Sequence, residues 1–183
     1  MTEATEQLEL TPKTWCPDKE RICLIGMPGS GKSTIGKQLS DKLKYSFFDT
    51  DEEIEKKEKT KIKDIFLKKG EDYFRSVETD IFNDLMNKNK IVISTGGGLI
   101  IKNLKQLKLS FNIYLYCDLD TLTQRASRNN LRPLLNEDTS LQMKNLFNER
   151  KEIYKSAADI TINATDNPKS TINEIIKEIS NDN

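Results

Sequence analysis

A glycine-rich motif at residues 26–33 constrains the fold of this chain more than any other feature. The motif reads Gly-Met-Pro-Gly-Ser-Gly-Lys-Ser and matches G-x-x-x-x-G-K-[ST], a loop whose backbone holds the phosphates of a nucleotide. A short apolar run at residues 22–25 precedes it, and apolar residues follow it at helical spacing, namely Ile35, Leu39 and Leu43. The order of strand, glycine loop and helix predicts a P-loop rather than an ordinary glycine-rich turn.

Length and charge restrict the class of protein. The 183 residues suffice for one well-buried core, so we expect a single domain over residues 20–183, preceded by a loosely ordered, polar extension at residues 1–19. Lysine plus arginine equals aspartate plus glutamate at 29 each, which predicts no nucleic-acid partner. No apolar run approaches the roughly 20 residues that span a bilayer, and no signal-peptide pattern is present. We therefore expect a cytoplasmic protein without a membrane partner.

The inventory of reactive side chains excludes several kinds of catalysis. The chain has no histidine, so a Ser-His-Asp triad, a histidine general base and a histidine-ligated zinc site are absent. Its three cysteines lack C-x-x-C spacing and are expected to be reduced. Carboxylates, cations, amides and hydroxyls must therefore carry the chemistry.

Five short apolar runs alternate with longer helical segments, at residues 22–25, 46–48, 91–93, 113–116 and 160–162. Runs this apolar indicate strands buried on both faces, and the helices between them indicate parallel crossovers. The sequence therefore predicts an α/β fold, a three-layer α/β/α sandwich around a five-stranded parallel sheet. Ligands of such sheets bind at the carboxyl ends of the strands, where we expect three segments to converge, namely the P-loop, Asp49-Thr50-Asp51 and Ser94-Thr-Gly-Gly-Gly98.

The P-loop pattern also assigns roles to individual residues. The backbone amides expected to point at the phosphates, aided by the dipole of the following helix, belong to Gly29, Ser30, Gly31 and Lys32. The ammonium of Lys32 should reach the β- and γ-phosphates, and the hydroxyl of Ser33 should hold Mg²⁺ with Thr34 assisting. The implied ligands are magnesium and ATP or GTP.

The usual second magnesium element is an aspartate that ends a hydrophobic strand, but the strand at residues 91–93 ends in Ser94 and Thr95. Asp49, which ends the second strand, is the replacement that we expect to bind the metal. The alternative for Asp49 and Asp51 is that they cap the helix that follows.

Arginine is scarce, with 6 arginines beside 23 lysines, so each arginine is informative. Arg150 falls on the apolar stripe of its helix, where an acidic substrate, an internal salt bridge or a snorkelling stem would explain it. Arg75 flanks a second stripe and could reach a ligand or pair with the nearby acids Glu71, Asp72 and Glu78. In the lysine-rich segment 56–69, we expect a solvated surface with an inward apolar face formed by Ile62, Ile65 and Phe66.

A polar segment between two helical patterns, at about residues 128–140, is expected to be a mobile lid. It carries Arg128 and Arg132 close together, which a plain surface connection would not explain. An arginine delivered by such a lid would neutralise charge on a transferring phosphoryl group.

Taken together, these motifs resemble the shikimate kinase family from about Arg21 to Ile179. The resemblance rests on residues 26–34 and on five further segments in the same order, namely Phe48-Asp-Thr-Asp-Glu-Glu-Ile54, Gly70-Glu-Asp-Tyr-Phe-Arg-Ser-Val-Glu78, Ser94-Thr-Gly-Gly-Gly98, Arg132-Pro-Leu-Leu135 and Glu149-Arg-Lys-Glu-Ile-Tyr154. It implies a nucleoside monophosphate kinase-like fold with strand order 2-3-1-4-5. It also implies the ATP-dependent phosphorylation of the shikimate 3-hydroxyl, a step of aromatic amino-acid biosynthesis, by a monomer.

The resemblance also implies roles for individual residues. The residues that would bind shikimate are Asp51, Arg75, Gly96, Gly97, Gly98 and Arg150. Arg132 would be the lid arginine, Arg125 would stack on adenine, and Ser33 and Asp49 would serve magnesium. Catalysis would depend on Lys32, Asp51 and Arg132, with Asp51 accepting a hydrogen bond from the reacting hydroxyl. The loop at residues 162–168 departs from the family because it lacks the aspartate often found there.

Two other functions stay open at this point. One is another small-metabolite P-loop kinase, such as one acting on gluconate. Within that class, a kinase of neutral polyols would not need Arg75 and Arg150 together. The other is a nucleotide-binding regulator without phosphotransfer, although such a protein would be expected to have lost Lys32, Asp51 or Arg132.

Overall fold

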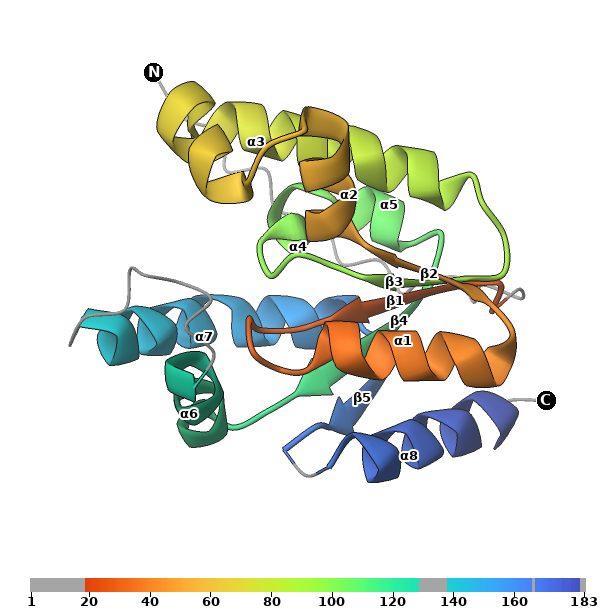
Figure 1. Cartoon of the computed structure of the whole chain (residues 1–183). Helices are drawn as coiled ribbons and strands as arrows, with labels where there is room; N and C mark the ends of the chain where they lie inside the picture. The colour runs from red at the N-terminus through yellow and green to blue at the C-terminus, as the bar shows by residue number, and fades with distance from the viewer. Residues whose placement is uncertain (1–18, 129–137, 166, 182–183) are drawn as a thin grey trace, which may run out of the picture.

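A five-stranded parallel sheet lies at the centre of the computed structural model, which describes residues 19–128, 138–165 and 167–181 (Figure 1). The strand order is β2-β3-β1-β4-β5, and every neighbouring pair is parallel. The strands are β1 (Arg21–Ile25), β2 (Ser46–Asp49), β3 (Ile91–Ser94), β4 (Phe111–Tyr116) and β5 (Ile160–Asn163). The predicted fold class, strand order and five strands are therefore confirmed.

Helices cover both faces of this sheet (Figure 1). They are α1 (Lys32–Leu43), α2 (Thr50–Glu58), α3 (Ile62–Met86), α4 (Leu99–Lys102), α5 (Leu104–Leu107), α6 (Leu119–Arg128), α7 (Asp138–Ala157) and α8 (Pro168–Asn181). Apolar residues of α1 and α8 pack on one face, and those of α3, α4, α5 and α7 pack on the other. The arrangement is the predicted three-layer sandwich.

The central strands alternate their side chains between two apolar clusters, one on each face of the sheet. In β1, Ile22 and Leu24 join one cluster, while Cys23 and Ile25 join the other, and all four are fully buried. Burial on both faces explains why this strand is a continuous apolar run. The described cysteines, Cys23 and Cys117, are buried thiols, as expected.

The expectation for the lysine-rich segment was correct for Ile65, and for Ile62, which packs partly buried against the core, but wrong for Phe66. Ile65 is 1% exposed, whereas Phe66 is 38% exposed and rests its ring 4.6 Å from that of Phe74. Ile65 and Phe66 are consecutive, so their side chains point about 100° apart around the helix, and only the face that carries Ile65 is fully buried.

Two further expectations fall largely outside the described residues. Of the expected extension at 1–19 only Lys19 is described, and of the expected lid at about 128–140 only the ends are, where Arg128 closes α6 and Asp138 opens α7. Arg132 lies in the part that is not described. Among the helices that are described, none combines the length and the apolar character needed to cross a membrane.

Candidate active site

The loop between β1 and α1 adopts the conformation that a phosphate cradle requires. Gly29 and Gly31 have φ of 84° and 93°, a left-handed backbone that glycine adopts without steric cost. Gly31 is also the N-cap of α1, and no side chain caps that helix. An anion at this end of the 12-residue helix would therefore meet no capping side chain, and it would face the positive end of the helix dipole.

Lys32 places its positive charge inside this loop. The residue is 8% exposed, and its Nζ donates to the carbonyl oxygens of Gly26 and Met27, at 2.8 Å each. The ammonium is thus held against the backbone of the loop, and its contact with the phosphates stays a prediction.

The hydroxyl of Ser33 contacts the last residues of two strands, β2 and β3. It donates to Asp49 Oδ2 at 2.6 Å and lies 3.2 Å from the hydroxyl of Ser94. Asp49 Oδ1 accepts from the backbone amides of Asp51 and Glu52, at 3.0 and 3.4 Å, and so caps α2. The two roles expected for Asp49, metal binding and helix capping, are thus compatible, because Oδ1 caps the helix and Oδ2 faces Ser33.

The residues around Ser33 fit a magnesium ion. They offer one carboxylate and two hydroxyls, and Mg²⁺ prefers a few oxygen ligands from the protein plus phosphates and water. The described residues contain no cluster of three or more acidic, cysteine or histidine side chains that could form a cage around a metal. Ser94, which the sequence marked only as a departure, belongs to this group because β2 and β3 pair Asp49 with Ser94.

The triple glycine after β3 allows three close contacts at once. A Cβ on Gly96 would lie 2.9 Å from both Asp51 Oδ1 and Glu78 Oε1, and one on Gly97 would lie 2.9 Å from Pro28 of the P-loop. A Cβ on Gly98 would lie 2.6 Å from Arg75 Nη1. The loop therefore brings the P-loop and the expected acceptor residues together, and any side chain would push them apart.

Glu78 lies at the centre of the expected acceptor end. It is 1% exposed, accepts from Arg75 Nη1 at 2.7 Å through Oε2, and has no hydrogen-bond partner for Oε1 within the described residues. Burial raises the pKa of Glu78, and the charge of Asp51 adds to this effect, while Arg75 and Arg150 oppose it. The sequence suggested Glu78 only as a pairing partner of Arg75, because its contact with the glycine loop is visible only in the fold.

The two expected substrate arginines have different partners. Arg75 pairs with Glu78 and, at 3.2 Å, with Glu71, so the expected pairing along the helix is confirmed for these two acids. Asp72, the third acid considered, instead lies 3.6 Å from Lys102.

Arg150 forms no ion pair within the described residues. Its Nη1 donates to the carbonyl of Gly97 at 3.1 Å, and its buried Nε has no partner there. The internal salt bridge considered for Arg150 is therefore wrong for the described chain. A half-buried cation whose donor has no partner suits an incoming anion.

Arg125 connects the nucleotide end to the loop after β5. Its guanidinium donates to the carbonyls of Ala164 at 3.1 Å and Thr165 at 2.9 Å. A Cβ on Gly29 would lie 3.9 Å from Arg125 Cβ, so this side chain also borders the P-loop. The position is consistent with the expected contact to a nucleobase.

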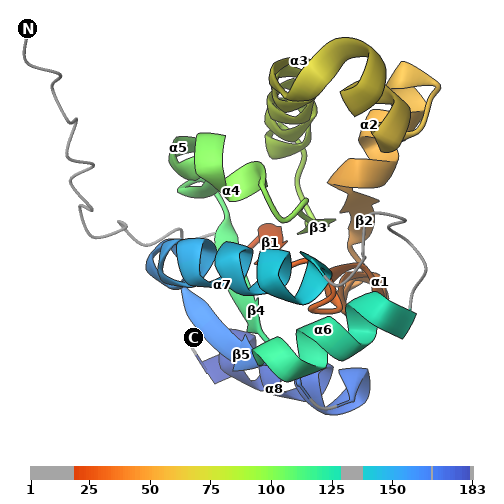
Figure 2. The ribbon, with the colours of Figure 1, turned by 90° about the vertical axis from the view of Figure 1, so that its left-hand side faces the viewer.

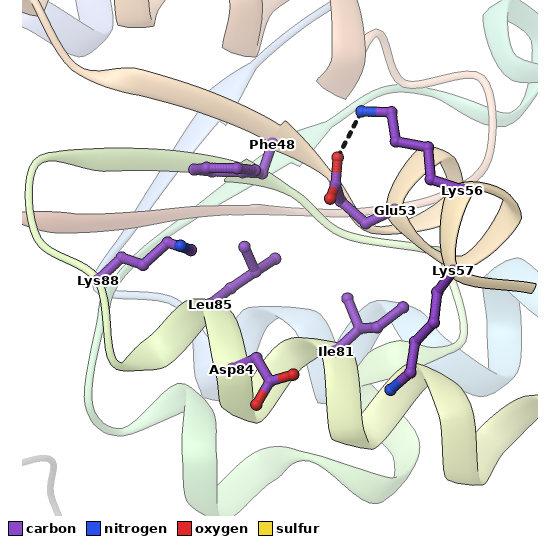
Figure 3. A pocket seen from close by; sticks show the side chains of 8 residues that line it. All are labelled: Phe48, Glu53, Lys56, Lys57, Ile81, Asp84, Leu85 and Lys88. Carbon is purple, nitrogen blue, oxygen red and sulfur yellow. Dashed lines mark hydrogen bonds and ion pairs between the residues drawn. The ribbon is translucent and has the colours of Figure 1, made fainter.

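The described site residues converge on one edge of the sheet. Figure 2 looks onto this edge, with α2 and α3 on one side of the strand ends and α6 and α7 on the other. A separate hollow of about 430 Å³ lies between α2 and α3 (Figure 3), lined by Phe48, Glu53, Lys56, Lys57, Ile81, Asp84, Leu85 and Lys88. None of the expected site residues lines that hollow.

Known proteins resemble this chain over most of its length. The family model for shikimate kinase matches residues 28–180. A shikimate kinase of Persephonella marina is 43% identical over 162 residues, which cover 86% of this chain and 98% of the relative. A shikimate kinase of Clostridium botulinum (strain Loch Maree / Type A3) is 46% identical over 149 residues, covering 79% of this chain and 88% of the relative.

Solved structures give the same result. The structure of the shikimate kinase from Acinetobacter baumannii in complex with shikimate matches with a TM-score of 0.85 and 33% identity, over 89% of this chain and 94% of that one. A deoxyadenosine kinase from M. mycoides has a TM-score of 0.59 and 17% identity over 87% of this chain and 99% of its own, which shows a shared fold alone.

Replacing Gly98 should weaken the acceptor end specifically. In Gly98→Ala the new methyl group would occupy the space of the Arg75 guanidinium, which must then move. We expect KM for the acidic acceptor to rise about tenfold or more, as for the loss of a charged hydrogen bond. Steady-state kinetics measure this effect, and KM for the nucleotide serves as the internal control because it should change little. An unchanged acceptor KM would contradict the contact.

The raised pKa of Glu78 predicts a pH dependence of stability. The folded chain holds this proton more tightly than the unfolded chain, whose pKa is about 4.5. The resulting stabilisation is fully present below pH 4.5 and is lost as the pH rises through the raised pKa. The free energy of unfolding of the wild type should therefore fall relative to that of Glu78→Gln over this range.

Urea titrations at several pH values would measure that difference. Glu71→Gln is the matched control, because it removes the exposed partner of the same Arg75 and should give a curve parallel to the wild type. Parallel curves for the wild type and Glu78→Gln would argue against the raised pKa.

Proposed function

The chain belongs to the shikimate kinase family, and we propose that the two ends of its site divide the family's reaction between them. That reaction is the ATP-dependent phosphorylation of the 3-hydroxyl of shikimate, which yields shikimate 3-phosphate and ADP in aromatic amino-acid biosynthesis. The P-loop would hold the donor, and the glycine loop with its surrounding charges would hold the acceptor.

One observation carries the acceptor assignment. Arg150 is a half-buried cation without an ion pair in the described chain, and it contacts the Gly97 carbonyl. Gly97 in turn packs against Pro28 of the P-loop, so an acid bound by Arg150 would lie next to the phosphate cradle. No observation favours a gluconate kinase or a regulatory protein.

We assign to Asp51 the orientation of the acceptor hydroxyl. Its carboxylate approaches Gly96, on the same loop that carries the contacts of Arg75 and Arg150. A carboxylate at this place would accept a hydrogen bond from the 3-hydroxyl and could receive its proton as the phosphoryl group is transferred. Most of the acceleration would come from positioning and from neutralising charge.

Charge neutralisation would fall to several groups. The amides of Gly29, Ser30 and Gly31 would hold the phosphates, together with Lys32. Ser33 and Asp49 would hold Mg²⁺ with Ser94 beside them, and this ion supplies Lewis-acid polarisation of the phosphoryl oxygens when bound. Thr34 would assist Ser33, and Arg125 would contact the adenine.

Some parts of the proposal rest on the sequence. The lid role of residues 128–140 and of Arg132 is carried over by resemblance, since Arg132 lies outside the described residues. We infer the cytoplasmic location and the absence of a nucleic-acid or membrane partner from the even charge balance and from the lack of a long apolar run. The monomeric state is carried over by resemblance.

A coupled ADP-release assay tests the function. We expect Mg²⁺- and ATP-dependent turnover with shikimate, and no more than background with gluconate or nucleoside monophosphates. The arginines and Asp51 would hold a carboxylate and a hydroxyl at one fixed separation, which the rigid ring of shikimate can match, whereas gluconate is an open-chain acid and nucleoside monophosphates have no carboxylate. Turnover only with a substrate other than shikimate would overturn the assignment.

The role proposed for Asp51 predicts that the single substitution Asp51→Asn lowers kcat strongly. Asp51→Asn keeps the shape of the side chain but weakens the hydrogen-bond acceptor, so kcat with shikimate should fall by about 10²- to 10⁴-fold. Glu52→Gln is the control, because it makes the same change at the neighbouring, exposed position of α2 and should keep near-normal turnover. Near-normal turnover of Asp51→Asn would sink this role.

A further inference from the structure

We propose that Tyr154 is a positioning residue for the acceptor, acting through the carbonyl of Gly97 to fix the glycine loop and Arg150 in their binding geometry. The inference rests on the proposed function, since it assigns Arg150 to the acidic acceptor. It adds a residue that does not itself contact the substrate.

Two residues of α7 donate to one carbonyl. Tyr154 lies one turn after Arg150, and both its hydroxyl and Arg150 Nη1 donate to the oxygen of Gly97. A carbonyl has two lone pairs, so this oxygen can accept both bonds. The middle glycine of the loop is therefore anchored to α7 at two points, and its other side touches Pro28.

The carbonyl of Gly97 also fixes one nitrogen of the Arg150 guanidinium. Nη1 donates to Gly97, while the buried Nε has no partner within the described chain. If the tyrosine hydroxyl were lost, Gly97 would keep Arg150 as its only described anchor on α7. The glycine loop and the guanidinium would then be free to shift relative to each other, and the acceptor carboxylate would meet a less ordered site.

The surroundings hold the Tyr154 hydroxyl in place as a donor. The residue is 1% exposed, and its ring stacks on that of Tyr114 with centroids 5.3 Å apart. Burial raises the pKa of Tyr154 to about 12, so the hydroxyl keeps its proton at neutral pH. A rigid, protonated donor suits a structural bond to the loop rather than a proton transfer.

Tyr114 offers a matched control within the same stack. It is 3% exposed, and its buried hydroxyl has no hydrogen-bond partner within the described residues. Removing either hydroxyl leaves the two stacked rings in place, but only the loss at Tyr154 removes a bond to Gly97. The pair therefore separates the effect of that bond from the effect of losing any tyrosine hydroxyl in this core.

The experiment compares the steady-state kinetics and thermal unfolding of Tyr154→Phe and Tyr114→Phe with the wild type. For Tyr154→Phe we expect KM for shikimate to rise about 3- to 10-fold, as for the loss of one buried hydrogen bond, with kcat and KM for ATP within about twofold. Tyr114→Phe should match the wild type in all three constants, and its stability should be equal or higher, because it loses an unsatisfied buried group.

Three results would overturn the proposal. One is an unchanged KM for shikimate in Tyr154→Phe, and another is an equal rise in Tyr114→Phe. The third is a joint change of kcat and both KM values in Tyr154→Phe, which would indicate general damage to the fold. If Tyr154→Phe folds poorly, calorimetric titration of shikimate onto its folded fraction supplies the affinity instead, and unchanged affinity again counts against the proposal.

Arg150→Ala separates this inference from the function on which it rests. If Arg150→Ala leaves KM for shikimate unchanged, the acceptor assignment itself fails. If Arg150→Ala raises that KM and Tyr154→Phe does not, only the role of Tyr154 fails.

Discussion

The contact between Gly97 and Pro28 is the constraint on which the rest of the site depends. Parallel pairing places β1 between β3 and β4, so the loops that follow β1 and β3 leave the sheet side by side. Without a side chain at Gly97, the backbone after β3 can rest on the proline ring of the P-loop. The phosphate cradle and the acceptor residues therefore share one wall, which in-line transfer between two bound substrates requires.

The charged groups at the acceptor end are buried or half-buried, and some of their polar atoms have no hydrogen-bond partner within the described chain. Glu78 is buried with one oxygen paired to Arg75 and the other unsatisfied, while Arg150 leaves its Nε unsatisfied. Buried charges of this kind contribute little to stability, and unpaired donors reduce it. The arrangement is better explained by the binding of a polar, acidic ligand, which would supply the missing partners.

The sequence predicted the sheet, the P-loop and the segments that meet at one edge of the sheet because those signals are local. A glycine pattern, an apolar run or an isolated arginine can be read within a few residues. The roles proposed for Glu78, Ser94 and Tyr154 could not be recognised in this way, since they depend on contacts with Gly96, Ser33 and Gly97 on other elements. The inward position expected for Phe66 was wrong because only the neighbouring face of the helix, which carries Ile65, is fully buried.

The two carboxylate oxygens of Asp49 bind different partners, which could couple the binding of the two substrates. One oxygen caps the helix that carries Asp51, and the other accepts from Ser33 at the phosphate end. Both oxygens belong to one rigid carboxylate, so a ligand that moved the second oxygen would also move the cap of α2. Linkage makes such an effect reciprocal, so an acceptor that orders α2 would return the same free energy to the affinity for the nucleotide.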